Sequence, residues 1–418
     1  MTPTGVRGRP RVLAIIQAGG AGSRMDVLTR EAPKPVLPFA GAFRLIDFPL
    51  SNLHNSGISD VWVSVQYLGQ HIADAVGNGK PWDLDRHRGG LKLVIPQEGA
   101  GPAATEGFVS GNAEELLANR DAIRAFGADA VVVMSADHVY RLDYSRVVEG
   151  HLAHDAECTV VTTEVGLADA SHHATVDVDR DGRVTGLAYK PEQPSTPTVA
   201  TEVFVYAPGP LIEVLEGLHR ELSTDPGNAD DEDGNALGDF GEHLLPALIE
   251  RGRVWAYALP GYWRDLGRPE VYVAAHRELL HTDVDLFTPD WPITTNSPLH
   301  LPTRVRAGAT VTDSLLSAGC DVAGTVRDSV LGRGVRVAED AVVADCILFD
   351  DVVVEAGARL DWTVVDSGTR VGPGARVGAE NDFEKVTPAA LTLVGRDCRV
   401  APGAHVARGA RLEPGTTV

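Results

Sequence analysis

The chain has 418 residues, of which 44% are hydrophobic and 23% charged, as is typical of a globular protein with more than one domain. Its formal net charge of −21 is a poor match for a nucleic-acid backbone or an anionic membrane surface. No apolar run approaches the roughly 20 residues of a membrane span, no signal peptide is indicated, and the four cysteines form no CxxC pair. We therefore expect a cytoplasmic protein without nucleic-acid or membrane partners.

A glycine cluster follows the first apolar run, residues 12–16. It reads Gln17-Ala18-Gly19-Gly20-Ala21-Gly22-Ser23-Arg24, and Pro33-Lys34-Pro35 comes after it. Glycines let backbone N–H groups approach a phosphate chain, and Arg24 and Lys34 would neutralise its charge. An ordinary turn between a strand and a helix is the alternative, but the two spaced cations favour a triphosphate site. Ser23-Arg24 fits neither a Walker A loop nor a dinucleotide fingerprint.

Apolar runs alternate with helical segments from residue 12 to about residue 280. Strand-like runs cover residues 61–66, 91–95, 130–134, 158–163 and 203–206, and helical segments cover 113–118 and 243–250. This alternation predicts an α/β domain, residues 12–285, with a mostly parallel sheet covered on both faces. A basic arm, residues 1–11, precedes it, and the acidic, Gly-rich stretch 227–239 is interpreted as a loop.

The character of the chain changes after residue 285. Four prolines between residues 289 and 302 indicate an extended linker, residues 286–303. Beyond it, aliphatic residues recur in triplets with a step of six residues, and each triplet starts 17 residues after the start of the previous one. The repeating positions are Leu331, Val337, Val343, Leu348, Val354, Leu360, Val365, Val371 and Val377, and then Val394, Val400, Val406, Leu412 and Val418. The spacing predicts a triangular parallel β-helix over residues 304–418, because a β-sandwich would not keep a six-residue step.

Two acids are the candidate metal ligands. Asp137 follows the strand-like run 130–134, where ligands bind in open α/β sheets, although an Asp at this place also commonly caps a helix. Asp265 lies in Tyr262-Trp263-Arg264-Asp265 and could instead form a structural pair with Arg264. Together the two acids would hold Mg²⁺ against phosphate oxygens.

Two further residues are candidates for substrate contacts. Lys190, after the run 184–189, could hold a sugar phosphate, although most lysines at such places are simply solvated. Gln97 could read an adenine edge through its amide or could cap a loop.

Several more segments complete a family pattern. They are Phe43-Arg44-Leu45-Ile46-Asp47-Phe48, Ser51-Asn52, Asn55-Ser56-Gly57-Ile58, Ala136-Asp137-His138-Val139-Tyr140, Asp239-Phe240-Gly241 and Tyr262-Trp263-Arg264-Asp265. With the glycine loop and the downstream Lys34-Pro35, they resemble the bacterial ADP-glucose pyrophosphorylase (glucose-1-phosphate adenylyltransferase) family over nearly the whole chain. The resemblance implies a Rossmann-like nucleotidyltransferase domain followed by a left-handed parallel β-helix. It also implies Mg²⁺, a homotetramer and small-molecule allosteric effectors.

The resemblance also assigns roles to residues. The implied reaction joins ATP and glucose 1-phosphate into ADP-glucose, for glycogen or α-glucan synthesis, and releases pyrophosphate. The implied catalytic residues are Arg24, Lys34, Asp137 and Asp265, of which the two acids hold the metal. The implied nucleotide-binding residues are Gly19, Gly20, Gly22, Ser23, Arg24, Gln97 and Gly111, and the implied sugar-phosphate-binding residues are Lys190, Thr201 and Asp239.

The chain departs from the family pattern at several positions. Gln17 replaces a leucine, Tyr189 replaces a glutamate expected to hold sugar hydroxyls, and Ala200-Thr201-Glu202 replaces Ser-Met-Gly. The segment Phe108-Val109-Ser110-Gly111-Asn112-Ala113-Glu114-Glu115 replaces Trp-Tyr-Arg-Gly-Thr-Ala-Asp-Ala, and Glu31 replaces a lysine associated with sugar-bisphosphate activators. Most of the residues lost from the family pattern are those expected to bind the sugar. The pattern therefore predicts the class of reaction better than it predicts the identity of the sugar.

Three functions remain compatible with the sequence. The first is the adenylyltransferase itself or an enzyme for another sugar phosphate. The second is a catalytically weak regulatory subunit, which the altered sugar side favours and the intact metal acids disfavour. The third is an added acyltransferase in the β-helix, for which His405 is the only histidine available as a base.

Overall fold

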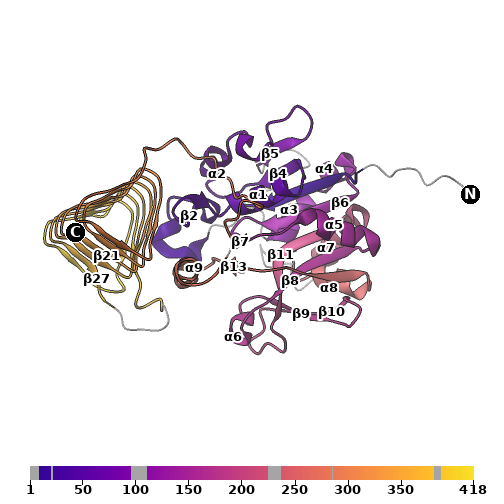
Figure 1. Ribbon diagram of the computed structural model, residues 1–418. Coiled ribbons are helices and arrows are strands. Elements are labelled where there is room, and N and C mark those ends of the chain that lie inside the picture. The colour runs from indigo at the N-terminus through magenta and orange to yellow at the C-terminus, as the bar shows by residue number, and fades with distance from the viewer. Residues whose placement is uncertain (1–8, 20–21, 96–110, 225–236, 285, 381–386) are drawn as a thin grey trace, which may run out of the picture.

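The computed structural model describes residues 9–19, 22–95, 111–224, 237–284, 286–380 and 387–418. An α/β domain is followed by a triangular parallel β-helix that stands beside it (Figure 1). The helices are α1 (Asp47–Asn55), α2 (Gly69–Val76), α3 (Asn112–Ala118), α4 (Arg120–Phe126), α5 (Tyr144–Ala153), α6 (Leu167–Ala170), α7 (Pro208–Thr224), α8 (Leu244–Glu250) and α9 (Pro269–His281). Within the described residues, none of these helices is long and apolar enough to cross a membrane.

The central sheet of the first domain is built around β1. Its strands are β1 (Val12–Gln17), β4 (Asp60–Ser64), β5 (Gly90–Val94), β6 (Ala130–Ser135), β8 (Cys158–Glu164), β9 (Ala174–Val178), β10 (Val184–Tyr189), β11 (Thr198–Tyr206) and β12 (Val254–Ala258). Strands β6, β1, β4 and β5 lie in that order and are parallel, whereas β11 runs antiparallel to β6 and β8. The parallel half therefore carries the glycine loop at its carboxyl edge.

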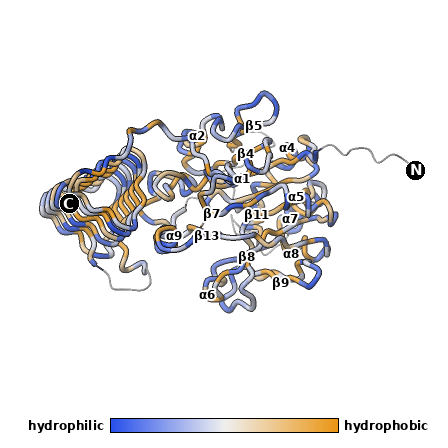
Figure 2. The backbone as a smooth tube through the Cα atoms, viewed as in Figure 1, coloured by the Kyte–Doolittle hydropathy of each residue, from blue (hydrophilic) through white to orange (hydrophobic). Residues whose placement is uncertain are grey.

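Two apolar layers cover the sheet. Successive residues of a strand point to opposite faces, so Ala14 and Ile16 of β1 belong to one buried cluster and Leu13 and Ile15 to the other. Helices α1, α2 and α5 contribute to the first cluster, and α3, α7 and α8 to the second. Figure 2 shows hydrophobic stretches, in orange, in both the α/β domain and the β-helix.

The β-helix consists of three parallel sheets. One contains β14 (Arg304–Val305), β17 (Asp321–Val322), β20 (Arg336–Val337), β23 (Val353–Val354), β26 (Arg370–Val371) and β29 (Arg399–Val400). The second contains β15 (Thr310–Thr312), β18 (Thr325–Arg327), β21 (Val342–Ala344), β24 (Arg359–Asp361), β27 (Arg376–Gly378) and β30 (His405–Val406). The third contains β16 (Leu315–Leu316), β19 (Val330–Leu331), β22 (Ile347–Leu348), β25 (Thr363–Val365), β28 (Thr392–Val394) and β31 (Arg411–Leu412).

The six-residue series lines the interior of these coils as predicted. Val354, for example, is fully buried and pairs in register with Val337 above and Val371 below. The series ends at Val418, which is 42% exposed because no further coil covers it.

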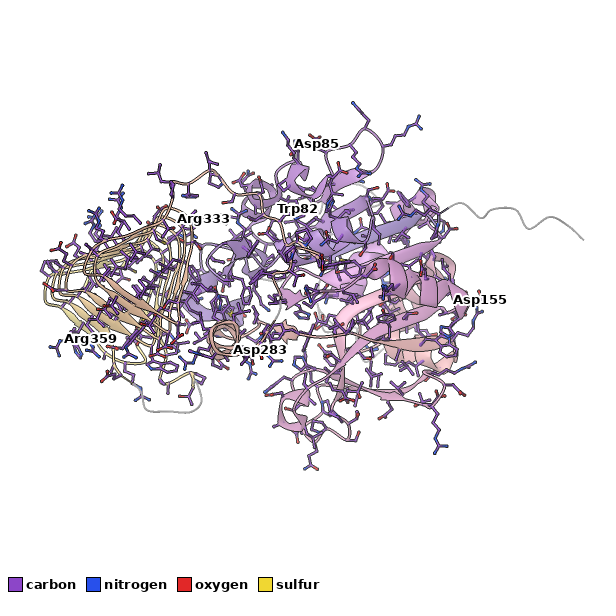
Figure 3. The ribbon with its side chains drawn as sticks, in the orientation of Figure 1. Trp82, Asp85, Asp155, Asp283, Arg333 and Arg359 are labelled. Carbon is purple, nitrogen blue, oxygen red and sulfur yellow. The ribbon has the colours of Figure 1, made fainter. Side chains whose placement is uncertain are left out.

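The third sheet is apolar on both sides. Leu331 and Leu348 point into the solenoid, while their neighbours Val330 and Ile347 pack against the α/β domain. Arg333 lies between the domains (Figure 3), pairs with Asp350 at 3.3 Å and donates to the Ala42 carbonyl. This face is therefore covered by the rest of the chain.

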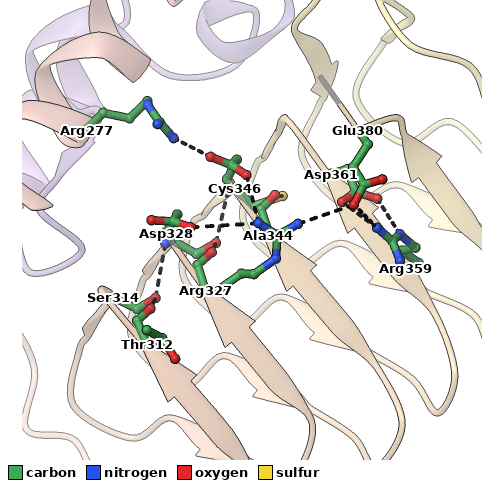
Figure 4. Close-up of polar contacts among 12 residues, drawn as sticks. Arg277, Thr312, Ser314, Arg327, Asp328, Ala344, Cys346, Arg359, Asp361 and Glu380 are labelled. Atoms are coloured by element: carbon green, nitrogen blue, oxygen red, sulfur yellow. Dashed lines mark hydrogen bonds and ion pairs between the residues drawn. The ribbon is translucent and has the colours of Figure 1, made fainter. Parts of the chain in front are cut away.

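Polar contacts also join α9 to the β-helix. Arg277 of α9 donates to the Asp345 carboxylate, and Arg327 approaches the same carboxylate from the solenoid at 3.6 Å (Figure 4). The two domains thus share an apolar interface with a polar rim.

The linker, residues 286–303, is extended but is held against the catalytic domain. Trp291 Nε1 donates to Asn52 Oδ1 at 2.8 Å, the Thr294 N–H donates to Ser51 Oγ at 3.0 Å, and Arg44 donates to the Asn296 carbonyl at 3.0 Å. Part of the family pattern in residues 43–52 therefore serves to hold this segment.

Candidate active site

A two-stranded ladder brings the two predicted acids together. Asp137 follows β6, and the next strand, β7 (His138–Tyr140), pairs antiparallel with β13 (Trp263–Asp265). The register places Asp265 opposite His138. Lys34 Nζ lies 2.6 Å from Asp137 Oδ2 and 3.2 Å from Asp265 Oδ1. Side chains that are 103 and 231 residues apart in the sequence thus meet at Lys34.

Lys34 is the cation of this cluster. It belongs to the 3₁₀ helix η2 (Lys34–Val36) and is 4% exposed. Its side chain packs closely against Gly22, because a Cβ at position 22 would lie only 2.9 Å from the Cβ of Lys34. Burial would lower the pKa of Lys34, but the two carboxylates outweigh it and raise that pKa. Burial would likewise raise the pKa of Asp137 and Asp265, yet the charge of Lys34 holds both below their usual range. Both carboxylates are therefore ionised at neutral pH.

His138 adds a second positive charge. Its Nδ1 lies 3.0 Å from the Thr201 carbonyl, and its Nε2 faces carboxylate oxygens of Asp137, Asp265 and Glu202 at 3.4, 3.6 and 3.9 Å. Because both ring nitrogens face acceptors, the imidazolium fits the site best. Burial lowers the pKa of His138, but the three carboxylates together raise it above its usual value.

Glu202 is a site residue that was not predicted, although its replacement of a glycine was visible in the sequence. The pairing of β11 with β8 shifts between Ala200 and Phe204, and Glu202 sits in this irregularity with φ of +56°. This left-handed backbone conformation is normally adopted by glycine. Burial raises the pKa of Glu202, and the charges of Asp137 and Asp265 add to the increase.

Thr201 does not face the site as expected. Its side chain is fully buried, and its hydroxyl donates to the Val161 carbonyl at 2.9 Å. The assignment of Thr201 as a sugar-phosphate ligand is therefore corrected: the threonine fixes the strand, and its neighbour Glu202 reaches the cluster.

The glycine loop follows β1 at the sheet edge. Gly22 has φ of +64° and precedes η1 (Ser23–Thr29), in which Ser23 and Arg24 are exposed. Gly20 and Gln97 lie outside the described residues. Gly111 precedes α3 with φ of +91°, and a Cβ there would lie 2.2 Å from the Gly238 carbonyl oxygen. Close backbone packing is thus one reason for glycine at position 111.

A cavity of about 1140 Å³ opens beside the acids. It is lined by Arg24, Lys190, Asp265 and residues of α9. Lys190 Nζ donates to the Tyr189 hydroxyl at 2.6 Å, and that hydroxyl donates to Asp239 Oδ2 at 2.6 Å. The predicted sugar-side residues Lys190 and Asp239 are therefore joined through the phenol that replaces the expected glutamate.

The donor set fits a divalent magnesium ion. Oxygen ligands suit this hard cation, and the carboxylates of Asp137 and Asp265 are already ionised and aimed at one point. In the described part of the chain, ligand atoms of Asp137, His138 and Glu202 lie within 4.8 Å of one another. The carboxylates of this set would hold the ion.

This fold and acid pair define a nucleotidyltransferase, and comparison with known proteins agrees. The model of the nucleotidyl transferase family matches residues 13–282, and that of the GlmU-like C-terminal hexapeptide family matches residues 302–394. Proteins named glucose-1-phosphate adenylyltransferase are 35% identical in Thermomicrobium roseum and 30% in Acetivibrio thermocellus. These matches cover 96% and 97% of this chain, and 93% and 94% of the two relatives. The chain belongs to the glucose-1-phosphate adenylyltransferase family, with a left-handed β-helix as its second domain.

Proposed function

We propose that this protein catalyses the reaction of ATP with glucose 1-phosphate to give ADP-glucose and pyrophosphate. The observation that carries the proposal is the meeting of Lys34, Asp137 and Asp265 at the sheet edge beside the glycine loop. A large cavity with Arg24 and Lys190 on its walls adjoins these acids and offers cations for the two phosphate groups.

In this proposal, each side chain positions a substrate or balances its charge. Amides near Gly19 and Gly22, with Arg24, bind the triphosphate, and Lys190 binds the sugar phosphate, whose oxygen attacks the α-phosphorus in line. Mg²⁺ held by Asp137 and Asp265 would offset the charge on the leaving pyrophosphate. The protein needs no nucleophile, because positioning and electrostatics suffice for this kind of transfer.

Pyrophosphate release tests the proposal. We expect release only with ATP, glucose 1-phosphate and Mg²⁺ together, and a loss of several orders of magnitude in kcat for Asp265→Asn. Asp169→Asn is the matched control, since Asp169 lines the same cavity without contacting the cluster. Near-normal turnover of Asp265→Asn at limiting Mg²⁺ would refute the metal assignment.

A different sugar 1-phosphate is the second candidate. It is favoured by Tyr189, which occupies the place of an expected acid and bonds to Asp239. A panel of sugar 1-phosphates in the same assay separates the two candidates through their kcat/KM values.

The proposal extends to the assembly and its setting. We infer a homotetramer under metabolite control in the cytoplasm, as the relatives' family suggests. The four cysteines are free and buried, which suits a reducing compartment. Light scattering on the purified protein tests the oligomeric state.

A further inference from the structure

Two buried oxygens beside the glycine loop lack a hydrogen-bond partner. Gln17 is 6% exposed and Glu115 is 4% exposed. In the described part of the chain, Gln17 Oε1 and Glu115 Oε1 have no hydrogen-bond partner, although the side chains of Ser64, Gln17 and Gln66 lie close enough to the Glu115 carboxylate to lower its pKa. Buried polar groups are nearly always paired, and each exception calls for an explanation. These positions hold leucine and alanine in the family pattern, so the pair is particular to this chain.

Both residues lie at the edge of the sheet beside the glycine loop. Gln17 ends β1, pairs in register with Ser64 of β4, and donates through Nε2 to the carbonyl of Asn112, the first residue of α3, at 2.9 Å. Strand β1 lies between β4 and β6, and open α/β sheets bind ligands at such a crossing point. Glu115 belongs to the first turn of α3, which begins directly after Gly111.

A movable amide covers this pair. Gln66, which is half-buried, donates through Nε2 to Glu115 Oε2 over a long 3.4 Å contact. Its side chain lies where a Cβ on Gly19 would be 3.1 Å away. An NH₂ group thus already faces Glu115 above the glycine loop.

We infer that Gln17 and Glu115 select the nucleobase, their two unpaired oxygens accepting hydrogen bonds from an exocyclic amino group that enters beside the Gln66 amide. This inference rests on the proposed function, because it assumes that a nucleoside triphosphate binds at the glycine loop. The 6-amino group of adenine carries two hydrogens for the two oxygens. Hypoxanthine and uracil present a carbonyl oxygen there, which would face acceptors only. Burial raises the pKa of the Glu115 carboxyl to about 7, despite its polar neighbours, so a donor from the ligand also stabilises its ionised form.

A triphosphate panel tests this selection. ATP, purine riboside triphosphate and ITP carry an amino group, a hydrogen and a carbonyl oxygen at position 6, and ITP also carries a hydrogen on N1. We expect kcat/KM for pyrophosphate release to fall in that order, by roughly 100-fold from ATP to ITP. The nucleotide-induced increase in Tm should follow the same order without requiring turnover. Equal use and equal stabilisation by ATP and ITP would overturn the inference.

Substitutions assign the effect to the two side chains. Glu115→Gln keeps the volume and supplies an NH₂ donor for a carbonyl oxygen, so the preference for ATP over ITP should narrow at least about tenfold. Gln17→Leu should narrow it as well, because it removes one acceptor. Glu114→Gln is the control, since Glu114 bonds to the Leu237 N–H outside the pair and should leave the preference unchanged. An unchanged preference in both Glu115→Gln and Gln17→Leu would overturn the assignment.

The Tm measurement separates this inference from the proposed function. If no sugar 1-phosphate supports pyrophosphate release, the proposed reaction fails. A larger Tm increase with ATP than with ITP would then still support base selection.

Discussion

Replacing Lys34 by methionine tests the electrostatic design of the acid cluster. The ammonium group contacts Asp137 and Asp265, whose side chains are only 25% and 19% exposed. Removing one partner of a buried ion pair costs about 3–5 kcal/mol, because the remaining charge stays desolvated. We expect about 3 kcal/mol for Lys34→Met, since both carboxylates retain some contact with water. That is a large share of the roughly 5–15 kcal/mol by which folded proteins are stable.

The loss should depend on pH. In the wild-type protein the pKa values of Asp137 and Asp265 are lowered, so their contribution to stability is present above the unfolded pKa and lost as the pH falls through the folded one. Without Lys34, burial is opposed mainly by the charge of His138, so both pKa values should rise, and protonation on acidification relieves the unpaired charge. The difference in unfolding free energy between variant and wild type should therefore shrink from pH 7.5 to pH 5.

Mg²⁺ should act as a substitute cation. Because Lys34 occupies the point at which both carboxylates aim, its removal should strengthen metal binding in the absence of nucleotide. A ligand at 100 times its Kd stabilises a protein by about 2.7 kcal/mol, so saturating Mg²⁺ should recover much of the loss. Urea unfolding with and without Mg²⁺ at both pH values measures these effects, with Lys80→Met, an exposed lysine, as control. An equal loss under all four conditions would refute the reasoning.

Three further substitutions probe other parts of the chain. Val354→Asp buries an unpaired carboxylate inside the solenoid at a cost of several kcal/mol, whereas Val353→Asp on the same strand should be tolerated; denaturation and light scattering compare them. Glu202→Gly relieves a left-handed conformation and should stabilise the protein by about 1 kcal/mol in urea unfolding, and a decrease in stability would contradict this. Activation by fructose 1,6-bisphosphate should be weak and should increase in Glu31→Lys, because Arg30 is paired with Glu413; strong activation of the wild type, measured as velocity against activator concentration, would contradict this.

The fold was predictable where the sequence is periodic. Apolar runs that alternate with helical segments predicted the mostly parallel sheet, and the six-residue step of aliphatic residues predicted the solenoid. Asp137 could be singled out because it follows a strand-like run, and Asp265 because of the motif Tyr262-Trp263-Arg264-Asp265; their role as metal ligands stays a prediction. The meeting of Lys34 with both acids could not, since it depends on the antiparallel pairing of β7 and β13, which no local pattern encodes.

Other features depend on irregular backbone. Glu202 reaches the cluster only because β11 changes register beside it, and Thr201 turns away for the same reason. The linker's prolines predict extended structure, but its contacts with Ser51 and Asn52 arise from tertiary packing. Such outcomes depend on the positions of distant segments rather than on composition.

The two departures at positions 189 and 202 are linked by geometry. The family pattern places an acid at 189, where this chain has Tyr189, and a glycine at 202, where it has Glu202. Burial and the acid Asp239 raise the pKa of Tyr189, and the charge of Glu202 contributes to the same shift, so the two side chains share one electrostatic environment. The site has thus lost a carboxylate on β10 and gained one on β11. This exchange keeps its acidic character but moves the negative charge toward His138, Asp137 and Asp265.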